Sequence, residues 1–159
     1  MGAHRDAHVE PVLMAITSKD DPQTPDLLYL NGNIEIMVGD SVIVVGPFEG
    51  ALLLLPSLEA LAIAVLRLRD LHSRVEVVVV GDSPSLWLVG KPPPKSDTVE
   101  IHYRQQKSGP VLRTAFDTAC EQAIKDFLSW LEGERPSSTW SSEAQHIRQT
   151  LITVWPSLA

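Results

Sequence analysis

Ser83 is the residue of this sequence whose type and position best fit a catalytic role. It follows the apolar run VEVVVV at 75–80 through a Gly-Asp-Ser tripeptide. Serine hydrolases present their nucleophile at the end of a buried strand, where a base activates it and hydrogen-bond donors stabilise the oxyanion. One hypothesis is therefore a small hydrolase or transferase that uses polar groups around Ser83, His102 and Arg104.

The tripeptide Gly81-Asp82-Ser83 resembles the first motif block of the GDS-type (SGNH) hydrolases, and the resemblance implies a nucleophilic serine. In that family an oxyanion-hole asparagine follows the block, and an Asp-x-x-His pair stands near the carboxyl end. Here both asparagines, Asn31 and Asn33, precede the serine, and the sequence contains no Asp-x-x-His. The chain therefore departs from the family pattern at every residue that would activate the serine.

The tetrapeptide Val-Gly-Asp-Ser occurs twice, at 38–41 and at 80–83, and each copy separates two apolar runs. A nucleophile is needed once, whereas every hairpin needs a turn, and Gly and Asp are turn formers. We therefore interpret both copies as turns and predict no catalytic residue. The repeat also suggests the hypothesis of an internal duplication of a strand-turn-strand-helix unit.

No metal or cofactor is predicted. His4 and His8 have the i, i+4 spacing of helical metal ligands, but no third ligand stands beside them. Cys120, the single cysteine, lies on the apolar side of a predicted helix, where a thiol packs in the core. The sequence has no Gly-Lys-Ser/Thr phosphate loop and no dinucleotide fingerprint. These features favour a binding protein over an enzyme.

The charge of the chain argues against several partners. Its 159 residues carry a formal net charge of −7 at pH 7, and only the stretch 91–113 is basic. An acidic protein is repelled by nucleic acid and by anionic membranes. The longest apolar tract, 51–66, is interrupted by Pro56 and Glu59 and is too short to cross a bilayer. With no export signal, the expected location is cytoplasmic.

Alternating apolar and polar residues predict the strands. In 33–38, Ile34, Ile36 and Val38 share one face. Asn31-Gly32 predicts a tight hairpin turn before this strand, because both residues tolerate the positive φ of a type I′ turn. Further strands are predicted at 9–17, 41–46, 75–80, 85–90 and 98–104.

Helical spacing of apolar residues predicts three helices. A cap at Ser57 is predicted to begin a helix that ends near Leu71. Pro110 is predicted to begin the longest helix, which ends near Gly133, and a short helix is predicted from Ser142. The buried stripe of the longest helix comprises Leu112, Ala115, Phe116, Ala119, Cys120, Ala123, Ile124, Phe127 and Leu131.

Together these elements predict an α+β fold of two layers. The prediction is a mixed or mainly antiparallel sheet of five or six strands, with two main helices on one face and a short C-terminal helix. The chain is divided into a flexible tail at 1–8, a single α+β domain at 9–133, a linker at 134–141 and a C-terminal helix at 142–159. That helix is expected to pack on the same domain.

The predicted binding surface lies on the strand at 98–104. If alternate residues face the helices, then Glu100, His102 and Arg104 face the other way. Trp87 is expected to join them, giving the aromatic and charged composition of binding hot spots. The expected function is therefore a non-catalytic protein-binding or accessory domain, such as an immunity-type protein that masks a partner. A self-associating structural subunit, for example a homodimer, is a further hypothesis.

The four tryptophans are divided between core and surface. Trp130 and Trp155 are predicted to close the core, because they stand beside apolar helical stretches. Trp87 and Trp140 are predicted to be partly exposed and available for binding.

Overall fold

The strands form two antiparallel sheets, not one. The computed structural model describes residues 9–46, 51–81, 84–91 and 97–159. The first sheet has the order β1 (Val12–Ser18), β2 (Gly32–Val38) and β3 (Ser41–Val45). The second sheet contains β4 (Arg74–Val77), β5 (Leu86–Lys91), β6 (Thr98–Tyr103), β7 (Gln106–Lys107) and β8 (Val111–Leu112). The α+β class is confirmed, whereas the prediction of a single five- or six-stranded sheet is wrong.

A short segment, residues 51–53, joins the two sheets at one end. Gly32 N–H donates to Leu52 O at 3.1 Å, and Leu53 N–H donates to Val80 O at 2.8 Å. Gly81 follows with a φ of +132°, and a Cβ there would lie 1.9 Å from a carbonyl oxygen of the same segment. At this end the two sheets are therefore linked through residues 51–53. Among the residues described, no strand of one sheet pairs directly with a strand of the other there.

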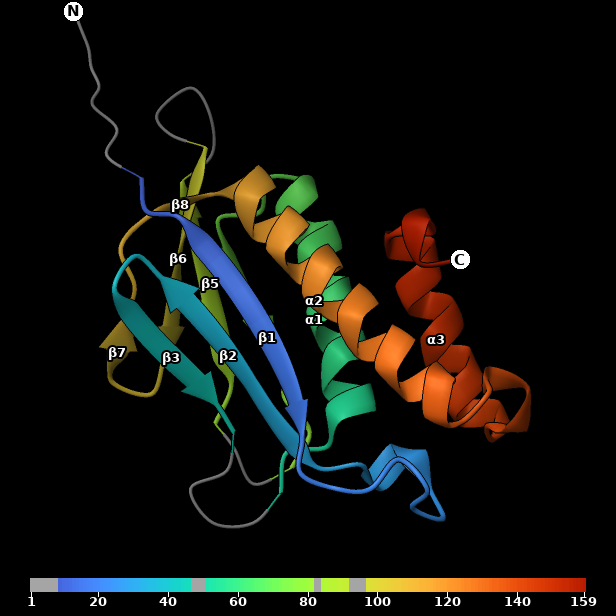
Figure 1. Cartoon of the computed structure of the whole chain (residues 1–159). Helices are drawn as coiled ribbons and strands as arrows, with labels where there is room; N and C mark the ends of the chain where they lie inside the picture. Colours follow the sequence, from blue (N-terminus) through green and yellow to red (C-terminus); the bar gives the residue numbers. More distant parts are fainter. Residues whose placement is uncertain (1–8, 47–50, 82–83, 92–96) are drawn as a thin grey trace, which may run out of the picture.

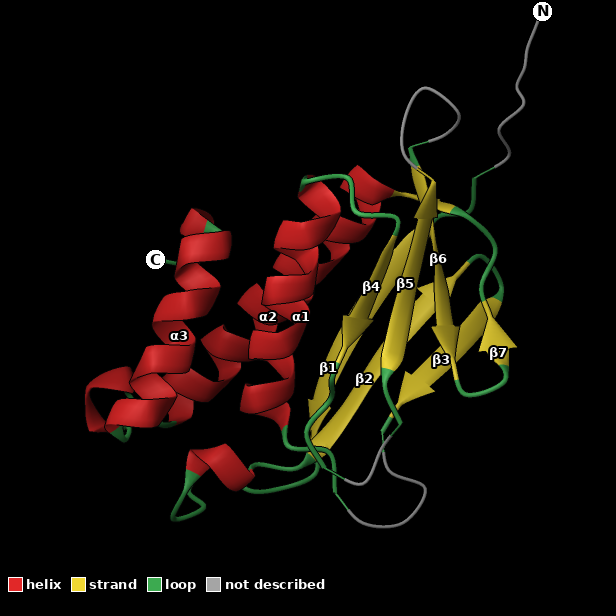
Figure 2. Ribbon diagram, turned by 180° about the vertical axis from the view of Figure 1, so that it is seen from behind, coloured by secondary structure: helices red, strands yellow, loops and turns green. Residues whose placement is uncertain are grey.

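Three α-helices lie on one side of the strands (Figure 1). They are α1 (Leu54–Arg69), α2 (Arg113–Glu134) and α3 (Ser142–Val154). Helix α1 packs against β4, and α2 packs against β1. Helix α3 packs on α1, on the side that faces away from the strands (Figure 2). The predicted two layers are thus extended by α3 into a third.

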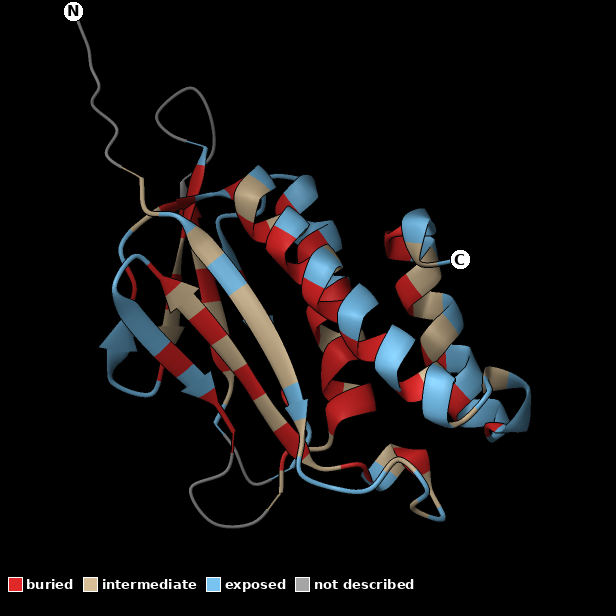
Figure 3. Ribbon diagram, viewed as in Figure 1, coloured by how far each residue is buried: buried red, intermediate tan, exposed pale blue. Residues whose placement is uncertain are grey.

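The core lies between the inner faces of the sheets and the two central helices (Figure 3). Alternation along β2 buries Ile34, Ile36 and Val38, as the sequence predicts. The buried Tyr103 connects the sheets, because its Oη donates to Gly46 O at 3.2 Å. Three short 3₁₀ helices complete the described elements: η2 (Leu27–Tyr29), η3 (Ser137–Thr139) and η4 (Pro156–Leu158).

A run of strands followed by a helix occurs twice: β1–β3 precede α1, and β4–β8 precede α2. The two Val-Gly-Asp-Ser copies do not occupy equivalent places in this order. The first forms the turn between β2 and β3, with Gly39 at a φ of 57°. The second follows β4, the first strand of its unit, and its residues 82 and 83 lie outside the described residues. The tetrapeptide therefore gives no support to the duplication hypothesis.

Two helices begin elsewhere than predicted, because tertiary contacts replace local caps. Helix α1 begins at Leu54, and the buried Ser57 lies within its first turns. The Ser57 Oγ accepts a hydrogen bond from Val80 N–H at 2.9 Å instead of capping the helix. Helix α2 begins at Arg113 and not at Pro110, since the two residues before it form β8 and pair with β6.

The predicted hairpin turn at 31–32 and the predicted cap of the last helix are both wrong. Asn31-Gly32 makes no hairpin: β1 reaches β2 through a longer loop, and a Cβ on Gly32 would lie 2.0 Å from Thr17 O. The glycine is required by this close approach of backbones. At α3, the cap is Ser141, whose Oγ accepts from Ala144 N–H at 3.3 Å, one residue before the predicted cap.

Helix α1 ends with a left-handed residue that is not glycine. His72 N–H donates to Arg67 O at 3.1 Å and Leu71 N–H donates to Leu68 O at 3.0 Å, which is the Schellman pattern. Leu71 has a φ of 61°, a conformation that costs an L-residue with a Cβ about 1–2 kcal/mol. The sequence places a leucine where a glycine is usual.

Replacing Leu71 by glycine is expected to raise the free energy of unfolding by about 1 kcal/mol, because glycine adopts this conformation without strain. Urea denaturation of the two proteins measures the change. Leu71→Ala is the matched control, since it removes the same half-exposed side chain but keeps the Cβ. Equal stability of the glycine and alanine variants would contradict the assignment of strain.

Candidate functional site

The predicted binding residue Trp87 lies on the outward face of the second sheet. Strand β5 places it opposite Glu76 on β4 and opposite His102 on β6. Residues at the alternate positions, including Leu88 and Ile101, face inward and are buried. Three strands therefore bring Glu76, Trp87 and His102 side by side, because side chains alternate with a period of two.

Paired charges flank the Trp87 ring. Arg74 Cζ lies 4.3 Å from the ring centroid, which is cation–π geometry. His102 Nε2 lies 3.0 Å from Glu100 Oε1, and both side chains are partly exposed. Arg74, Glu76, Trp87, Glu100 and His102 are together called the Trp87 face below. It offers one partly exposed aromatic ring and charges of both signs to solvent.

Arg104, the fourth predicted binding residue, lies beside the Trp87 face. It occupies the turn between β6 and β7 with a φ of 56°. The alternation that turns Glu100 and His102 outward therefore ends at Tyr103. The guanidinium carbon of Arg104 lies 5.5 Å from the centroid of the Tyr103 ring. The structure thus brings three predicted binding residues onto one face and places Arg104 at the adjoining turn.

Ser83 and Cys120 are two further residues whose side chains are of a reactive type. Ser83, the residue that resembles a hydrolase nucleophile, lies outside the described residues. Cys120 lies on the buried side of α2, where burial raises the pKa of the thiol well above its ordinary value, and Asp117 raises it further. In the described ranges, no group of three or more His, Cys, Asp or Glu side chains is placed to hold a metal ion.

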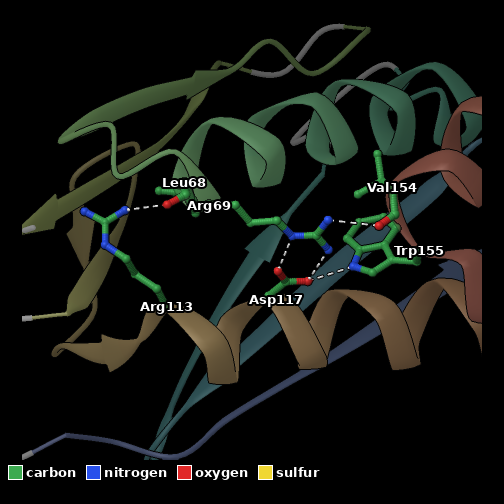
Figure 4. A network of polar contacts seen from close by, with 6 residues as sticks. All are labelled: Leu68, Arg69, Arg113, Asp117, Val154 and Trp155. Atoms are coloured by element: carbon green, nitrogen blue, oxygen red, sulfur yellow. Dashed lines mark hydrogen bonds and ion pairs between the residues drawn. The ribbon is translucent and has the colours of Figure 1, made fainter.

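A polar network joins the three helices (Figure 4). Asp117 accepts hydrogen bonds from Arg69 Nε at 2.6 Å, from Arg69 Nη2 at 2.9 Å and from Trp155 Nε1 at 2.7 Å. Arg69 Nη1 donates to Val154 O at 2.9 Å. Burial raises the pKa of Asp117, but the hydrogen bonds from Arg69 and Trp155 and the charge of Arg69 lower it below its ordinary value overall. The network holds the end of α3 against α1 and α2.

Arg113 is buried, although it belongs to the basic stretch of the sequence, and its side chain is only 5% exposed. Its Nη1 donates to Leu68 O and to His72 O, both at 3.2 Å, so it caps the carboxyl end of α1. Burial lowers the pKa of Arg113, and Asp97, whose Oδ1 lies 3.5 Å from Nε, opposes this. A Cβ on Gly90 would lie 2.1 Å from Nη2, so a glycine makes room for the guanidinium.

A groove of about 430 Å³ lies between β1 and α2. One wall consists of residues 14–18 of β1, and the other of Ala123, Asp126, Phe127 and Trp130 of α2. The four helical residues follow i, i+3, i+4, i+7 spacing and therefore share one face. Trp130 is 40% exposed, and its ring centroid lies 5.8 Å from that of Phe127. This arrangement is called the β1–α2 groove below.

The predicted burial is wrong for two tryptophans, and one of them, Trp130, lines this groove. Trp155 is buried as predicted, but Trp130 is exposed and Trp140 is buried. Trp140 lies in the segment predicted as a linker, where its Nε1 donates to Arg135 O at 2.8 Å. A finer helical projection contains a signal for Trp130, since the buried stripe passes through Phe127 and Leu131 and leaves position 130 at its margin.

An apolar row crosses the outward face of the first sheet. The strand register places Leu13 beside Met37 and Met37 beside Val42. Leu13 is 68% exposed and Val42 is 49% exposed. Exposed apolar rows of this kind favour association, so the self-association considered from the sequence would be favoured here.

No helix in the described part of the chain is long and apolar enough to cross a membrane. Comparison with known proteins gives no match: no protein-family model, no curated protein and no solved structure is significantly similar to this chain.

Proposed function

We propose that this protein is a non-catalytic binding domain that engages another protein through the Trp87 face. The observation that carries the proposal is the position of Trp87, an outward-facing aromatic ring held by Arg74 and flanked by Glu76 and His102. Tryptophan and arginine are enriched among the residues that dominate binding energy. A sheet face with this composition suits the surface of a folded partner.

The charges define the partner further. The Trp87 face presents both signs, which allows directional ion pairs, while the chain as a whole carries a net charge of −7. Opposite net charge accelerates encounter between proteins. The proposed partner is therefore a protein with a basic or mixed surface, masked in the manner of an immunity protein; nucleic acid, a membrane and a cofactor are not part of the proposal.

Replacing Trp87 by alanine is expected to weaken partner binding by roughly 2 kcal/mol or more, because a central aromatic anchor is lost. The partner is first identified by pull-down from the native lysate with the wild-type chain. Calorimetric titration of the purified partner then compares wild type, Trp87→Ala, and the charge reversals Glu100→Lys and Arg104→Glu. All three variants should keep the fold, measured by circular dichroism.

Tyr29→Ala is the matched control, because it removes an exposed aromatic side chain from a different surface. It is expected to bind the same partner with unchanged affinity. If the partner binds Trp87→Ala and both charge reversals as tightly as wild type, the Trp87 face is excluded as the binding surface.

Two other hypotheses stay predictions. A small hydrolase or transferase would use Ser83, His102 and Arg104, and turnover lost in Ser83→Ala would support it. A homodimer or larger assembly would use the row that contains Leu13 and Val42, and a mass that rises with concentration would support it. The Trp87 face favours neither.

A further inference from the structure

Strand β1 is an edge strand of the first sheet and lies beside α2 (Figure 1). Its residues 14–18 line the β1–α2 groove. Gly39 N–H donates to Pro11 O at 2.9 Å and Lys19 N–H donates to Asn31 O at 2.7 Å, so the odd-numbered residues bond to β2. Bonded and non-bonded positions alternate along antiparallel strands. The backbone N–H and C=O groups of the even-numbered residues therefore point away from β2: Val12, Met14, Ile16 and Ser18.

The far side of β2 confirms this alternation. Gly32 lies opposite Ser18, and its N–H donates to Leu52 O, away from β1. The Ser18–Gly32 pair is thus a non-bonded position, as the alternation requires. Ile16 and Met14, two positions and four positions earlier, therefore present their backbone donors and acceptors to the groove.

The sequence of β1 carries none of the features that prevent strand addition, and α2 packs beside the strand without pairing with it. Its sequence, VLMAITS, contains no charged residue and no proline, and its seven residues keep regular register with β2. Edge strands are normally protected by lysine, proline, a bulge or short length, because their unpaired backbone groups attract other strands. Within the described ranges, no strand pairs with this edge. It is therefore suited to pairing with an added strand.

The helical wall defines what such a strand would carry. Phe127 and the exposed Trp130 offer apolar contact, and Ala123 is small enough to leave space beside β1. Among the described residues that line the groove, Asp126 alone is charged, and its Oδ1 accepts a hydrogen bond from Gln122 Nε2 at 2.9 Å. The groove thus favours a segment with an apolar side chain for Trp130 and a cationic side chain for Asp126.

We infer that the β1–α2 groove binds an extended segment of a partner protein, with a basic residue and an apolar residue, that adds to β1 as a fourth strand of the first sheet. Main-chain hydrogen bonds to Met14 and Ile16 supply affinity, while Trp130 and Asp126 supply selectivity, the division usual in strand addition. The groove volume of about 430 Å³ is that of an ordinary ligand pocket. This site is separate from the Trp87 face and accepts an unfolded segment in place of a folded surface.

The first experiment uses a random twelve-residue peptide library displayed on phage and selected on the full-length protein. Selected peptides should contain Lys or Arg and β-branched or aromatic residues. One selected sequence is then synthesised in two forms, N-methylated at odd or at even positions. A paired strand directs only alternate N–H groups to its neighbour, so one form should lose more than about tenfold in affinity and the other should bind like the parent. Equal loss, or no selected peptide, overturns the inference.

Hydrogen exchange of the full chain locates the added strand. In the free protein, the amides of Ala15 and Thr17 should be protected by their bonds to β2, whereas those of Met14 and Ile16 exchange rapidly. Saturation with the selected peptide should slow exchange at Met14 and Ile16. Unchanged exchange at both amides contradicts strand addition. Protection that rises with protein concentration in the absence of peptide would identify a second copy of this chain as the occupant and would also overturn the inference.

Variants separate this site from the Trp87 face. Trp130→Ala and Asp126→Lys should each reduce the affinity for the selected peptide by about tenfold or more, and both positions are exposed, so the fold should survive. Trp87→Ala should bind the peptide like wild type. If Trp87→Ala loses the peptide and Trp130→Ala keeps it, the groove is not the peptide site, and the proposal for the Trp87 face is unaffected.

Discussion

Replacing Phe116 by alanine should lower the free energy of unfolding by roughly 3–5 kcal/mol, the usual cost of removing a buried phenylalanine. Phe116 has no exposed surface and lies on α2 among the residues of the core cluster. The loss is a large part of the 5–15 kcal/mol that stabilises an ordinary domain, so the variant should be close to unfolding at moderate temperature. Urea denaturation followed by circular dichroism measures the change.

The opposite side of α2 supplies the control for this prediction. Lys125 is exposed on the same helix, and Lys125→Ala should change stability by less than about 0.5 kcal/mol. An unchanged denaturation midpoint in Phe116→Ala would show that the buried face of α2 had been assigned wrongly. A loss of similar size in both variants would show that the effect is not specific to the buried face of α2.

The placement of three predicted binding residues on one sheet face follows from local alternation. Glu100 and His102 are two residues apart on one strand, and Trp87 occupies an outward-facing position of the neighbouring strand. Period-two alternation together with a hairpin-like order is sufficient to bring them together. The same rule failed for Arg104 because it is the first residue of a turn with positive φ, and no alternation extends through a turn.

The β1–α2 groove could not be predicted in this way. Its walls come from segments that are far apart in the sequence, residues 14–18 and 123–130. Only tertiary packing decides that α2 lies along the free edge of β1. The sequence did contain the fact that β1 has no charged residue or proline, but this becomes informative only when β1 is known to be an edge strand.

The division into two sheets could not be predicted from the sequence for a related reason. Residues 52 and 53 belong to an apolar tract that leads into a helix, and nothing in their side chains shows that their backbone groups bond to residues 32 and 80. Backbone hydrogen bonds between separate sheets carry no side-chain signature. Arg113 is a similar case, since a basic residue in a basic stretch is normally exposed, and only the end of α1 requires it to be buried.

Replacing Asp117 by alanine should lower the free energy of unfolding by about 2–3 kcal/mol, because it leaves donors of the buried Trp155 and the partly buried Arg69 without an acceptor. The C-terminal end of α3 should loosen most, since the same arginine also binds Val154 O. Hydrogen exchange of the α3 amides, compared between wild type and Asp117→Ala, tests this local effect.

The charge of Asp117 makes the free energy of unfolding depend on pH, and the direction of this dependence follows from the pKa shift. Its pKa is below the ordinary value in the folded chain, so the ion pair stabilises the fold above the unfolded pKa of about 3.9 and is lost as pH falls through the folded value. Asp117→Asn keeps an acceptor for Trp155 but cannot ionise. The stability difference between wild type and Asp117→Asn should therefore be largest near pH 7 and shrink toward pH 3. Asp126→Asn, an exposed carboxylate on the same helix, should show a much smaller difference, and a pH-independent difference for Asp117→Asn would contradict the role of the ion pair.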